Sequence, residues 1–427
     1  VCSSDLIVDM LYPKGVPHSI PIISVTGTNG KTTTVRMISH IFKVYGHSVG
    51  MTTTEGIYID DKLLMGGDTT GPLSAQMLLS NRDIDIAVLE TARGGIIRSG
   101  LGYDLTDVGI LTNISKDHLG LDGIYTLEDL LHVKSLVVEA IKDSGYAILN
   151  ADDPIVIRAV PNIRANIIYF STHANNIFVH RHLAKGGTSV FVKDGTITIG
   201  VGEQVKQGVY IPQVPATFGG KLTHNVENTL AAVSAAYALK VPIATIRKAM
   251  YSFYSDEIQN PGRFNIFSIR DFRIIIDYGH NIAGYLTVLE TVKKMGATRL
   301  IGIIGVPGDR DDGAIAEIGK ISGEVFDRLI IKEDTDLRGR HKGEVAKLLK
   351  LGALSSGIAN DQISIIYDEE DALKFAISRA MAGDLIVIFY EKLKPILNII
   401  KNSENLSDKF NYKSTGFESD NILTPIE

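Results

Sequence analysis

The chain has 427 residues, of which 44% are hydrophobic and 22% are charged, and its formal net charge is -6. This length and composition predict two or three domains of an ordinary globular protein, and the negative charge argues against nucleic acid as a partner. A single cysteine excludes a disulfide framework and a cysteine-rich zinc site, and no apolar run is long enough to span a membrane.

The N-terminal segment, residues 1–20, precedes the first strand-like run and opens on VCSSDLIVDML, without a methionine. No signal peptide is found there. We interpret this segment as a leader that remains from a missing upstream part. The lone cysteine and the lack of a signal peptide favour a cytoplasmic protein.

Strand-like runs alternate with segments of helical spacing from residue 22 to about 150, which predicts a parallel sheet with helices on its faces. The predicted strands are 22–26, 86–90, 108–112 and 146–150, and the predicted helices are 31–45, 126–142 and, further on, 224–239. Residues 163–212 are short alternating runs split by Gly and Asp, which predict antiparallel hairpins. Residues 21–258 are therefore expected to form a central α/β domain, in which a parallel sheet is joined by a small antiparallel sheet.

A second alternating series begins near residue 265. Its predicted strands are 272–277, 299–305, 328–332, 363–367 and 385–390, and its helices are 282–295, 313–324, 342–353 and 369–381. Five strands with four crossovers predict a doubly wound, Rossmann-like domain over 259–401. The polar segment SDEIQNPGRF (255–264) marks the join, and residues 402–427 are predicted to be a loose polar tail.

The stretch GTNGKTT lies between the first predicted strand and the first predicted helix, where a phosphate-binding loop is found. In such a loop Lys31 reaches the terminal phosphates of a nucleotide and the Thr32 hydroxyl binds Mg²⁺. The common spacing has four residues between Gly and Gly-Lys, whereas this loop has two. The simpler alternative is a glycine turn that caps a helix. The loop residues expected to bind nucleotide are Gly27, Thr28, Asn29, Gly30, Lys31, Thr32 and Thr33.

The shortened loop resembles the ATP loop of the Mur ligase family, which includes peptidoglycan-building amide ligases and folylpolyglutamate synthases. Further stretches fit the same family in order, namely TNISKDHLGLDG (112–123), HNVENTLAA (224–232), PGRF (261–264) and DYGHN (277–281). The resemblance covers about residues 20–400. It implies a P-loop ATPase domain followed by a Rossmann-like domain, with ATP and Mg²⁺ as cofactors of an ADP-forming amide ligase.

One branch of the family fits more closely. The stretches that carry this resemblance are GDTTGP (67–72), ETARGGIIRSGLGYD (90–104), GVPGDRDD (305–312) and KEDTDLRGR (332–340). Members of the branch attach arginine to the side-chain carboxylates of a polyaspartate. The resemblance implies an acidic polypeptide and arginine as substrates, an acyl-phosphate intermediate, a homo-oligomer, and an ATP-grasp half upstream.

The metal and catalytic residues are expected to surround the phosphate loop. Glu90 ends an apolar strand, where an acid faces the carboxyl edge of the sheet. The resemblance implies that His118 binds a second Mg²⁺ and that Lys134 is carbamylated, because an ammonium cannot bind a cation. An unmodified or solvated Lys134 is the alternative. The predicted catalytic set is Lys31, Glu90, His118 and Lys134, and the predicted metal ligands are Thr32, Glu90, His118 and Lys134.

The family position of three further residues implies contacts with nucleotide. Asn228 is expected near the adenine, on the same helix start as His224 and Asn225. Arg263 is expected at the phosphates or ribose, and Asp277 at the ribose. The alternative for Asn228 is a polar residue that packs a helix.

The substrate sites are expected to be charged. Arg93 and Arg98 suit a carboxylate, which Arg grips with two parallel bonds, and the glycines beside them suit close backbone approach. The resemblance implies that Asp68, Thr70 and His280 shape the substrate sites. It also implies that Arg338 holds the free carboxylate of the incoming arginine, while Asp334 and Asp336 bind the guanidinium of that substrate. Solvated turns are the alternatives for both segments, and a lysine substrate would also be accommodated.

Two other functions stay open at this point. A Mur-type ligase could act on another acidic acceptor, such as a peptidoglycan precursor or a polyglutamate. The chain could also be a non-catalytic half that binds ATP and polymer.

Overall fold

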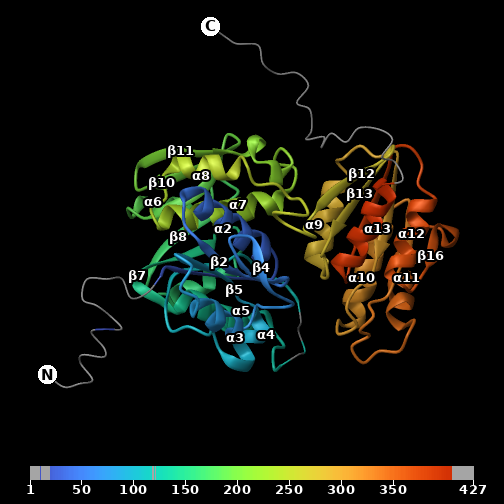
Figure 1. Ribbon diagram of the computed structural model, residues 1–427, viewed down its shortest axis with the longest axis horizontal. Coiled ribbons are helices and arrows are strands. Elements are labelled where there is room, and N and C mark those ends of the chain that lie inside the picture. Colours follow the sequence, from blue (N-terminus) through green and yellow to red (C-terminus); the bar gives the residue numbers. More distant parts are fainter. Residues whose placement is uncertain (1–9, 11–19, 118–119, 121, 406–427) are drawn as a thin grey trace, which may run out of the picture. The chain divides into compact units, whose positions relative to one another are not determined.

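The structure is a computed structural model that describes residue 10, residues 20–117, residue 120 and residues 122–405. The chain divides into two compact units (Figure 1). The first unit comprises residues 1–265 and 281–295, and the second comprises residues 266–280 and 296–427. Among the described residues, every helix is too short or too polar to cross a membrane.

The first unit is built on a single 11-stranded sheet in the order β11-β10-β9-β8-β7-β6-β1-β5-β2-β3-β4. Its strands are β1 (Ile22–Thr26), β2 (Val49–Thr52), β3 (Gly56–Ile59), β4 (Lys62–Gly66), β5 (Ile86–Glu90), β6 (Thr106–Leu111), β7 (Ile141–Asn150), β8 (Asn166–Ser171), β9 (Thr188–Lys193), β10 (Thr196–Val201) and β11 (Gln204–Tyr210). The strands from β9 to β2 pair in parallel. Antiparallel strands extend this sheet at both edges.

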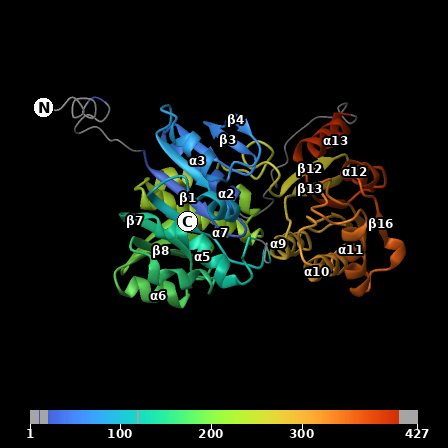
Figure 2. The same ribbon diagram turned by 90° about the horizontal axis from the view of Figure 1, so that it is seen from below.

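Helices cover both faces of this sheet (Figure 2). The helices of the unit are α2 (Lys31–Tyr45), α3 (Pro72–Leu79), α4 (Arg93–Ser99), α5 (Leu127–Glu139), α6 (Ile177–Ala184), α7 (Thr223–Ala238), α8 (Ile243–Met250) and α9 (Ile282–Val292), with short 3₁₀ turns at Val156–Asn162, Ile211–Gln213 and Pro215–Thr217. One apolar core joins α2, α7 and α8 to the sheet, and a second core on alternate strand residues joins α5 and α6. A smaller core holds α3 against β5.

The strand register explains why the phosphate loop and Glu90 come together. β1 lies between β5 and β6, with Val25 level with Glu90 and Thr26 level with Leu111. Because these strands are parallel, the residues that follow them meet at one edge of the sheet. The site of the first unit is therefore built at the carboxyl ends of β1, β5 and β6.

The second unit holds a six-stranded sheet in the order β12-β13-β17-β14-β15-β16. Its strands are β12 (Asn265–Ile269), β13 (Phe272–Asp277), β14 (Arg299–Ile304), β15 (Arg328–Ile331), β16 (Ile363–Ile365) and β17 (Asp384–Phe389), and its helices are α10 (Asp312–Gly323), α11 (Glu344–Ser355), α12 (Glu369–Ser378) and α13 (Leu393–Asn405), with a 3₁₀ turn at Asn360–Gln362. The strands from β13 to β16 pair in parallel. Figure 2 shows α12 and α13 on one face and α10 and α11 on the other.

This arrangement confirms the predicted fold class, with differences in detail. The antiparallel strands are continuous with the parallel sheet instead of forming a separate one. Within the predicted hairpin region, β8 is a parallel strand, and α6 crosses over to a parallel β9. The predicted tail is partly wrong, because α13 continues to Asn405; residues 406–427 and most of the predicted leader lie outside the described residues.

The predicted boundary between the domains, at 258–259, lies a few residues before the change of unit at 265–266. Residues 281–295 carry α9 and group with the first unit, although the sequence pattern placed this helix in the second series. Strands β2 to β4 and helices α3, α4, α8 and α13 were not predicted at all.

Candidate functional site

The phosphate loop is held in shape by glycines and by the segment after β6. Gly30 has a φ of 87° at the start of α2, and a Cβ there would lie 2.3 Å from Asn228 Oδ1. A Cβ on Gly27 would lie 1.9 Å from Thr112 Oγ1. The amide of Asn29 donates to Asn113 Oδ1 at 2.9 Å. Only glycine fits these two positions, so the loop can expose its backbone N–H groups at the start of α2.

A hydroxyl and a carboxylate meet directly beside this loop. The Thr32 hydroxyl donates to Glu90 Oε2 at 2.9 Å, and the amide of Thr54 donates to the same oxygen at 3.2 Å. The Arg263 guanidinium donates to the hydroxyls of Thr32 at 3.1 Å and Thr54 at 3.0 Å. The structure therefore brings together Thr32, Glu90 and Arg263, three residues predicted from the sequence to contact metal or phosphate.

A half-buried acid that was not predicted as a site residue, Glu55, lies behind Arg263. Glu55 Oε1 is 3.4 Å from the Arg263 guanidinium, and Glu55 Oε2 is 3.4 Å from that of Arg36. Burial raises the pKa of Glu55, but the two guanidinium groups lower it by more, so the carboxylate stays charged. Glu55 thus anchors Arg263 at the edge of the sheet.

Two lysines lie at the loop, of which Lys31 is half-buried and Lys134 is buried. Lys31 Nζ donates to the carbonyls of Gly27 at 3.2 Å and Thr28 at 2.9 Å, and Lys134 Nζ donates to Thr28 Oγ1 at 3.1 Å. Burial lowers the pKa of Lys31, with Glu90 opposing the shift. Burial and then Lys31 lower the pKa of Lys134 well below its usual range. Lys134 is only 4% exposed, so its amine faces the loop instead of solvent.

The oxygen donors at this edge fit Mg²⁺. The Thr32 hydroxyl and the Glu90 carboxylate are hard oxygen ligands that lie within hydrogen-bond distance of each other. His118 lies outside the described residues. Within the described part of the chain, no three His, Cys, Asp or Glu side chains gather around one point. The oxygens of Thr32 and Glu90 suit Mg²⁺, which keeps several waters and relies on substrate phosphates.

The start of α7 packs against the phosphate loop. Asn228 is buried, accepts from the Thr34 hydroxyl at 3.3 Å, and donates to Asn225 Oδ1 at 3.0 Å. Burial lowers the pKa of His224 to about 4, so its ring is neutral. The structure places Asn228 beside Gly30, and its role at the adenine remains a prediction. The side-chain amide of Asn260 also donates to the Thr33 hydroxyl, at 3.3 Å.

The predicted acceptor residues are only partly brought together. Asp68 accepts from the amide of Thr70 at 3.1 Å and from its hydroxyl at 2.7 Å, so the two form one turn before α3. Arg93 and Arg98 lie on the short helix α4, where Arg93 pairs with Asp122 at 3.2 Å and Arg98 is exposed. The neighbouring glycine Gly95 serves close packing, because a Cβ there would lie 3.0 Å from Gly71 Cα. Gly95 thus permits close approach of two backbones, and the expected contacts of Arg93 and Arg98 with a substrate remain a prediction.

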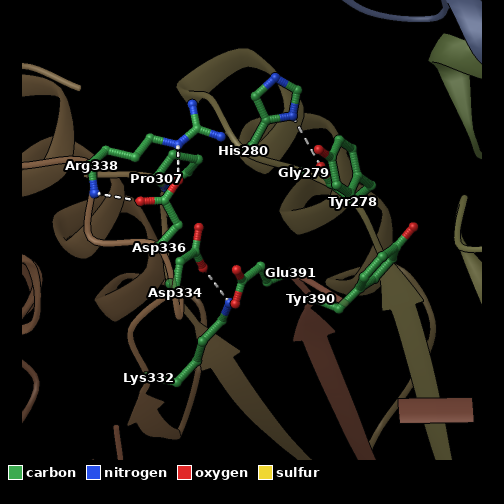
Figure 3. A pocket seen from close by; sticks show the side chains of 11 residues that line it. Tyr278, Gly279, His280, Pro307, Lys332, Asp334, Asp336, Arg338, Tyr390 and Glu391 are labelled. Carbon is green, nitrogen blue, oxygen red and sulfur yellow. Dashed lines mark hydrogen bonds and ion pairs between the residues drawn. The ribbon is translucent and has the colours of Figure 1, made fainter. Parts of the chain in front are cut away.

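The second unit carries its own pocket, a cavity of about 60 Å³ (Figure 3). It opens at the carboxyl ends of β13, β14, β15 and β17, where the strand order reverses, and this is where doubly wound sheets bind ligands. The residues that line it are Tyr278, Gly279, His280, Gly305, Pro307, Lys332, Asp334, Asp336, Arg338, Tyr390 and Glu391. Four predicted substrate residues, His280, Asp334, Asp336 and Arg338, thus share one pocket.

Arg338 is held in place by acids. Its guanidinium donates to Asp309 Oδ2 at 2.6 Å and lies 3.9 Å from Asp336 Oδ2, while its amide donates to Asp336 Oδ1 at 3.0 Å. Asp336 is mostly exposed and closes its own turn (Figure 3). The geometry therefore places Asp336 with Arg338 and leaves Asp334 deeper in the pocket.

Asp277 and His280 follow β13. The amide of Gly279 donates to Asp277 Oδ1 at 2.8 Å, and His280 Nδ1 lies 3.1 Å from the Tyr278 carbonyl. Figure 3 shows the His280 ring at the mouth of the pocket, across from Arg338. Asp277 shapes the turn that presents these side chains, and its expected contact with ribose remains a prediction.

A buried lysine forms the floor of this pocket and was not predicted. Lys332 is 1% exposed, and its ammonium lies 2.7 Å from Asp334 Oδ1 and 2.8 Å from Glu369 Oε2. Burial lowers the pKa of Lys332, but Asp334 and Glu369 raise it above its usual value, so the amine is charged. Its position in the sequence could have indicated a site residue, because Lys332 directly follows the strand β15. Glu391, which lines the same pocket, similarly lies just after the strand β17.

Comparison with known proteins points to one family along most of the chain. Residues 25–236 match the family description "Mur ligase middle domain", and residues 262–389 match "Mur ligase, glutamate ligase domain". These matches confirm the resemblance predicted from the motifs.

Three relatives set the scale of similarity. A cyanophycin synthetase of Crocosphaera subtropica is 42% identical over 92% of this chain, which spans 45% of that protein. A UDP-N-acetylmuramoyl-L-alanyl-D-glutamate–2,6-diaminopimelate ligase of Listeria monocytogenes is 27% identical over 90% of this chain and 75% of its own length. The structure of E. coli FolC in complex with ADP superimposes with a TM-score of 0.67 at 20% identity, covering 91% of this chain and 90% of FolC.

A half-buried acid on α7, Glu227, makes the stability of the first unit depend on pH. Burial, reinforced by Asp152 and Asp153, raises the pKa of Glu227 from its ordinary value of 4.5 to about 7. Between these two values the folded state holds a proton that the unfolded state has released. Stability from this group is therefore lost as the pH rises through this window, and it levels off above pH 7.

We predict that Glu227→Gln flattens this dependence, because the amide stays neutral at every pH. The free energy of unfolding of the variant minus that of the wild type should rise by about 2 to 3 kcal/mol from pH 5 to pH 8. Urea titrations at both pH values measure this difference, with Glu203→Gln at an exposed site as the control. An equal pH dependence in the wild type and Glu227→Gln would contradict the shifted pKa.

Proposed function

We propose that this chain, which belongs to the Mur ligase family, is an ATP-dependent ligase that joins arginine to a side-chain carboxylate of a polyaspartate. The observation that carries the amide-ligase part is the convergence of Lys31, Thr32, Glu90 and Arg263 at the carboxyl edge of one parallel sheet. The arginine and polyaspartate part is supported by the 42% identity to a cyanophycin synthetase over 92% of the chain. The chain spans less than half of that relative, so the activity of the whole protein is part of the proposal.

The proposed chemistry follows from the poor leaving group of a carboxylate. An oxygen of the acceptor carboxylate attacks the terminal phosphorus of ATP, and ADP leaves. The amine of arginine then attacks the carbonyl carbon of this acyl phosphate, phosphate leaves, and the amine loses a proton. Phosphoryl transfer between anions depends mainly on positioning and on neutralisation of charge.

The residues of the first unit suit that task. Lys31 and Arg263 supply positive charge beside the loop amides, where the phosphates of ATP would lie. Thr32 and Glu90 would hold Mg²⁺, which neutralises charge on the phosphates when bound. Glu55 keeps Arg263 directed at Thr32. Asn228 would contact the base and Asp277 the ribose.

Carbamylation of Lys134 belongs to the same proposal. The Lys134 amine lies 3.1 Å from the Thr28 hydroxyl, inside the loop region, and an ammonium there cannot bind a cation. A carbamate would carry anionic oxygens at this position and would serve as a further ligand or second-sphere partner of the metal. His118, by family position, would complete the set.

The pocket of the second unit suits the incoming arginine. Arg338 can hold the α-carboxylate, and the carboxylate of Asp334 faces the same space (Figure 3). Asp336 stays near Arg338 in this proposal and has a smaller part in binding the guanidinium. The polyaspartate would approach through Asp68, Thr70, Arg93 and Arg98. An ATP-grasp half upstream and a homo-oligomer complete the proposed assembly.

An alternative is a Mur-type ligase with another acidic acceptor, in line with the 27% identity to the Listeria ligase. The identity to the Listeria ligase is lower than the identity to the cyanophycin synthetase, which argues against this alternative. The acids of the second pocket favour an incoming amino acid with a cationic side chain. A non-catalytic protein is the other alternative, and the intact set of Lys31, Thr32, Glu90 and Lys134 around one loop argues against it.

We predict that the chain releases ADP with a short aspartate peptide only when arginine is supplied, whereas glutamate or diaminopimelate gives little release. Lys31→Ala should lower kcat/KM by about a hundredfold or more, because a cation at the phosphates is lost. Lys248→Ala, an exposed lysine on α8, is the matched control and should behave as the wild type.

Three outcomes of this assay would count against the proposal. Turnover with diaminopimelate or glutamate in place of arginine would support the alternative ligase. An absence of turnover with any of these amino acids would support the non-catalytic protein. Equal activity in Lys31→Ala and Lys248→Ala would refute the role of the loop.

For Lys134 we predict a carbamate signal in the ¹³C NMR spectrum of protein equilibrated with ¹³C-bicarbonate. The signal should be absent from Lys134→Ala and present in Lys248→Ala. ADP release should fall by about tenfold or more in Lys134→Ala, because an anionic group near the metal is lost. A wild-type spectrum without the signal, in active protein, would refute the modification.

A further inference from the structure

A closed circuit of hydrogen bonds lies beneath the pocket of the second unit. Lys332 Nζ donates to Asp334 and to Glu369, at 2.7 and 2.8 Å. The Glu369 carboxylate also accepts from the amide of Glu391 at 2.5 Å, and Glu391 Oε2 accepts from the amide of Thr335 at 2.8 Å. Because Thr335 follows Asp334 in the chain, the circuit closes on itself.

This circuit connects three elements that border the pocket. Lys332 and Asp334 follow β15, Glu369 is the first residue of α12, and Glu391 follows β17. The path of the lysine is narrow, since a Cβ on Gly305 would lie 2.6 Å from Lys332 Cε. One buried ammonium therefore fixes the ends of two strands and one helix against each other.

One carboxylate oxygen of Asp334 and one of Glu391 take no part in the circuit and are directed at the pocket. Lys332 occupies Oδ1 of Asp334 and Thr335 occupies Oε2 of Glu391, so Asp334 Oδ2 and Glu391 Oε1 are available to a ligand. Both residues line the pocket of Figure 3 and also an adjoining cavity of about 350 Å³. The circuit contains one ammonium, that of Lys332, and three carboxylates, two of which contact it, so the group keeps a net negative charge that suits a cationic side chain.

We propose that Lys332 is a positioning residue for the incoming amino acid, which holds Asp334 and Glu391 ready for the cationic end of its side chain. This inference rests on the proposed function for the identity of that amino acid. Lys332 itself does not contact the substrate; it acts through Asp334, which it contacts directly, and through Glu369, which holds the backbone of Glu391. Preorganised acids bind a guanidinium without first having to be ordered.

The competing interpretation is that Lys332 only stabilises the fold. Removing one member of a buried ion pair leaves an uncompensated charge, which by itself destabilises a protein. A variant that lacks the lysine but also lacks one of the acids restores the balance of charge, and it distinguishes the two interpretations. In Lys332→Met combined with Glu369→Gln, one positive and one negative charge are removed together, but Asp334 loses the ammonium that anchors it.

The experiment compares melting temperature and steady-state kinetics of full-length protein. Lys332→Met should melt about 10 °C or more below the wild type. Its KM for arginine should rise by about tenfold or more, while its KM for ATP stays unchanged. The double variant should regain most of the melting temperature but not the KM for arginine. Lys374→Met, at an exposed lysine that also faces two acids, is the control and should change neither quantity.

Each outcome is decisive. A double variant that recovers both quantities, or a KM for ATP that rises together with that for arginine, overturns the inference. Failure of both variants to fold assigns Lys332 to the fold alone and also overturns it. If the wild type uses another amino acid, the arginine part of the proposed function fails, and the same comparison with that amino acid tests Lys332. A wild type that neither binds nor consumes any amino acid overturns the proposed function itself.

Discussion

The contact between the Thr32 hydroxyl and the Glu90 carboxylate, at 2.9 Å, depends on the register of three parallel strands. β1 ends in the phosphate loop and β5 ends in Glu90, so the helix start and the acid meet without any long connection. Glu90 is 2% exposed, and burial raises the pKa of its carboxyl group, with Lys31 opposing the shift. The site is thus a set of buried charges that lie in place because the sheet places them.

Both units use the same edge of a parallel sheet and the same balance of buried charge. In the first unit, Glu55 lies between two arginines and directs Arg263 at Thr32. In the second unit, Lys332 lies between two acids and fixes the floor of a pocket. A buried ion pair is a poor source of stability, because desolvation offsets the attraction. Such groups are better explained by the rigid geometry that they give to a site.

The sequence predicted the elements that are strongly periodic and the residues that sit in motifs. β1, β5 and the start of α2 were located to the residue, because a β-branched run, a glycine turn and Lys-Thr are unambiguous signals. Strands β2 and β3 were missed because they have only four residues each, and β4 was missed because its residues are exposed. Glu55 and Lys332 were not singled out as site residues because their partners, Arg263 and Glu369, are distant in the chain. Helix α4 was not predicted, because the two glycines in its seven residues are unfavourable in a helix.

A crystal structure with Mg²⁺ and a non-hydrolysable ATP analogue tests the central claim most directly. The account predicts a triphosphate along residues 27–33, with Lys31 and Arg263 on its oxygens and the metal bound by Thr32 and Glu90. A triphosphate bound elsewhere, or a metal that touches neither Thr32 nor Glu90, would contradict it.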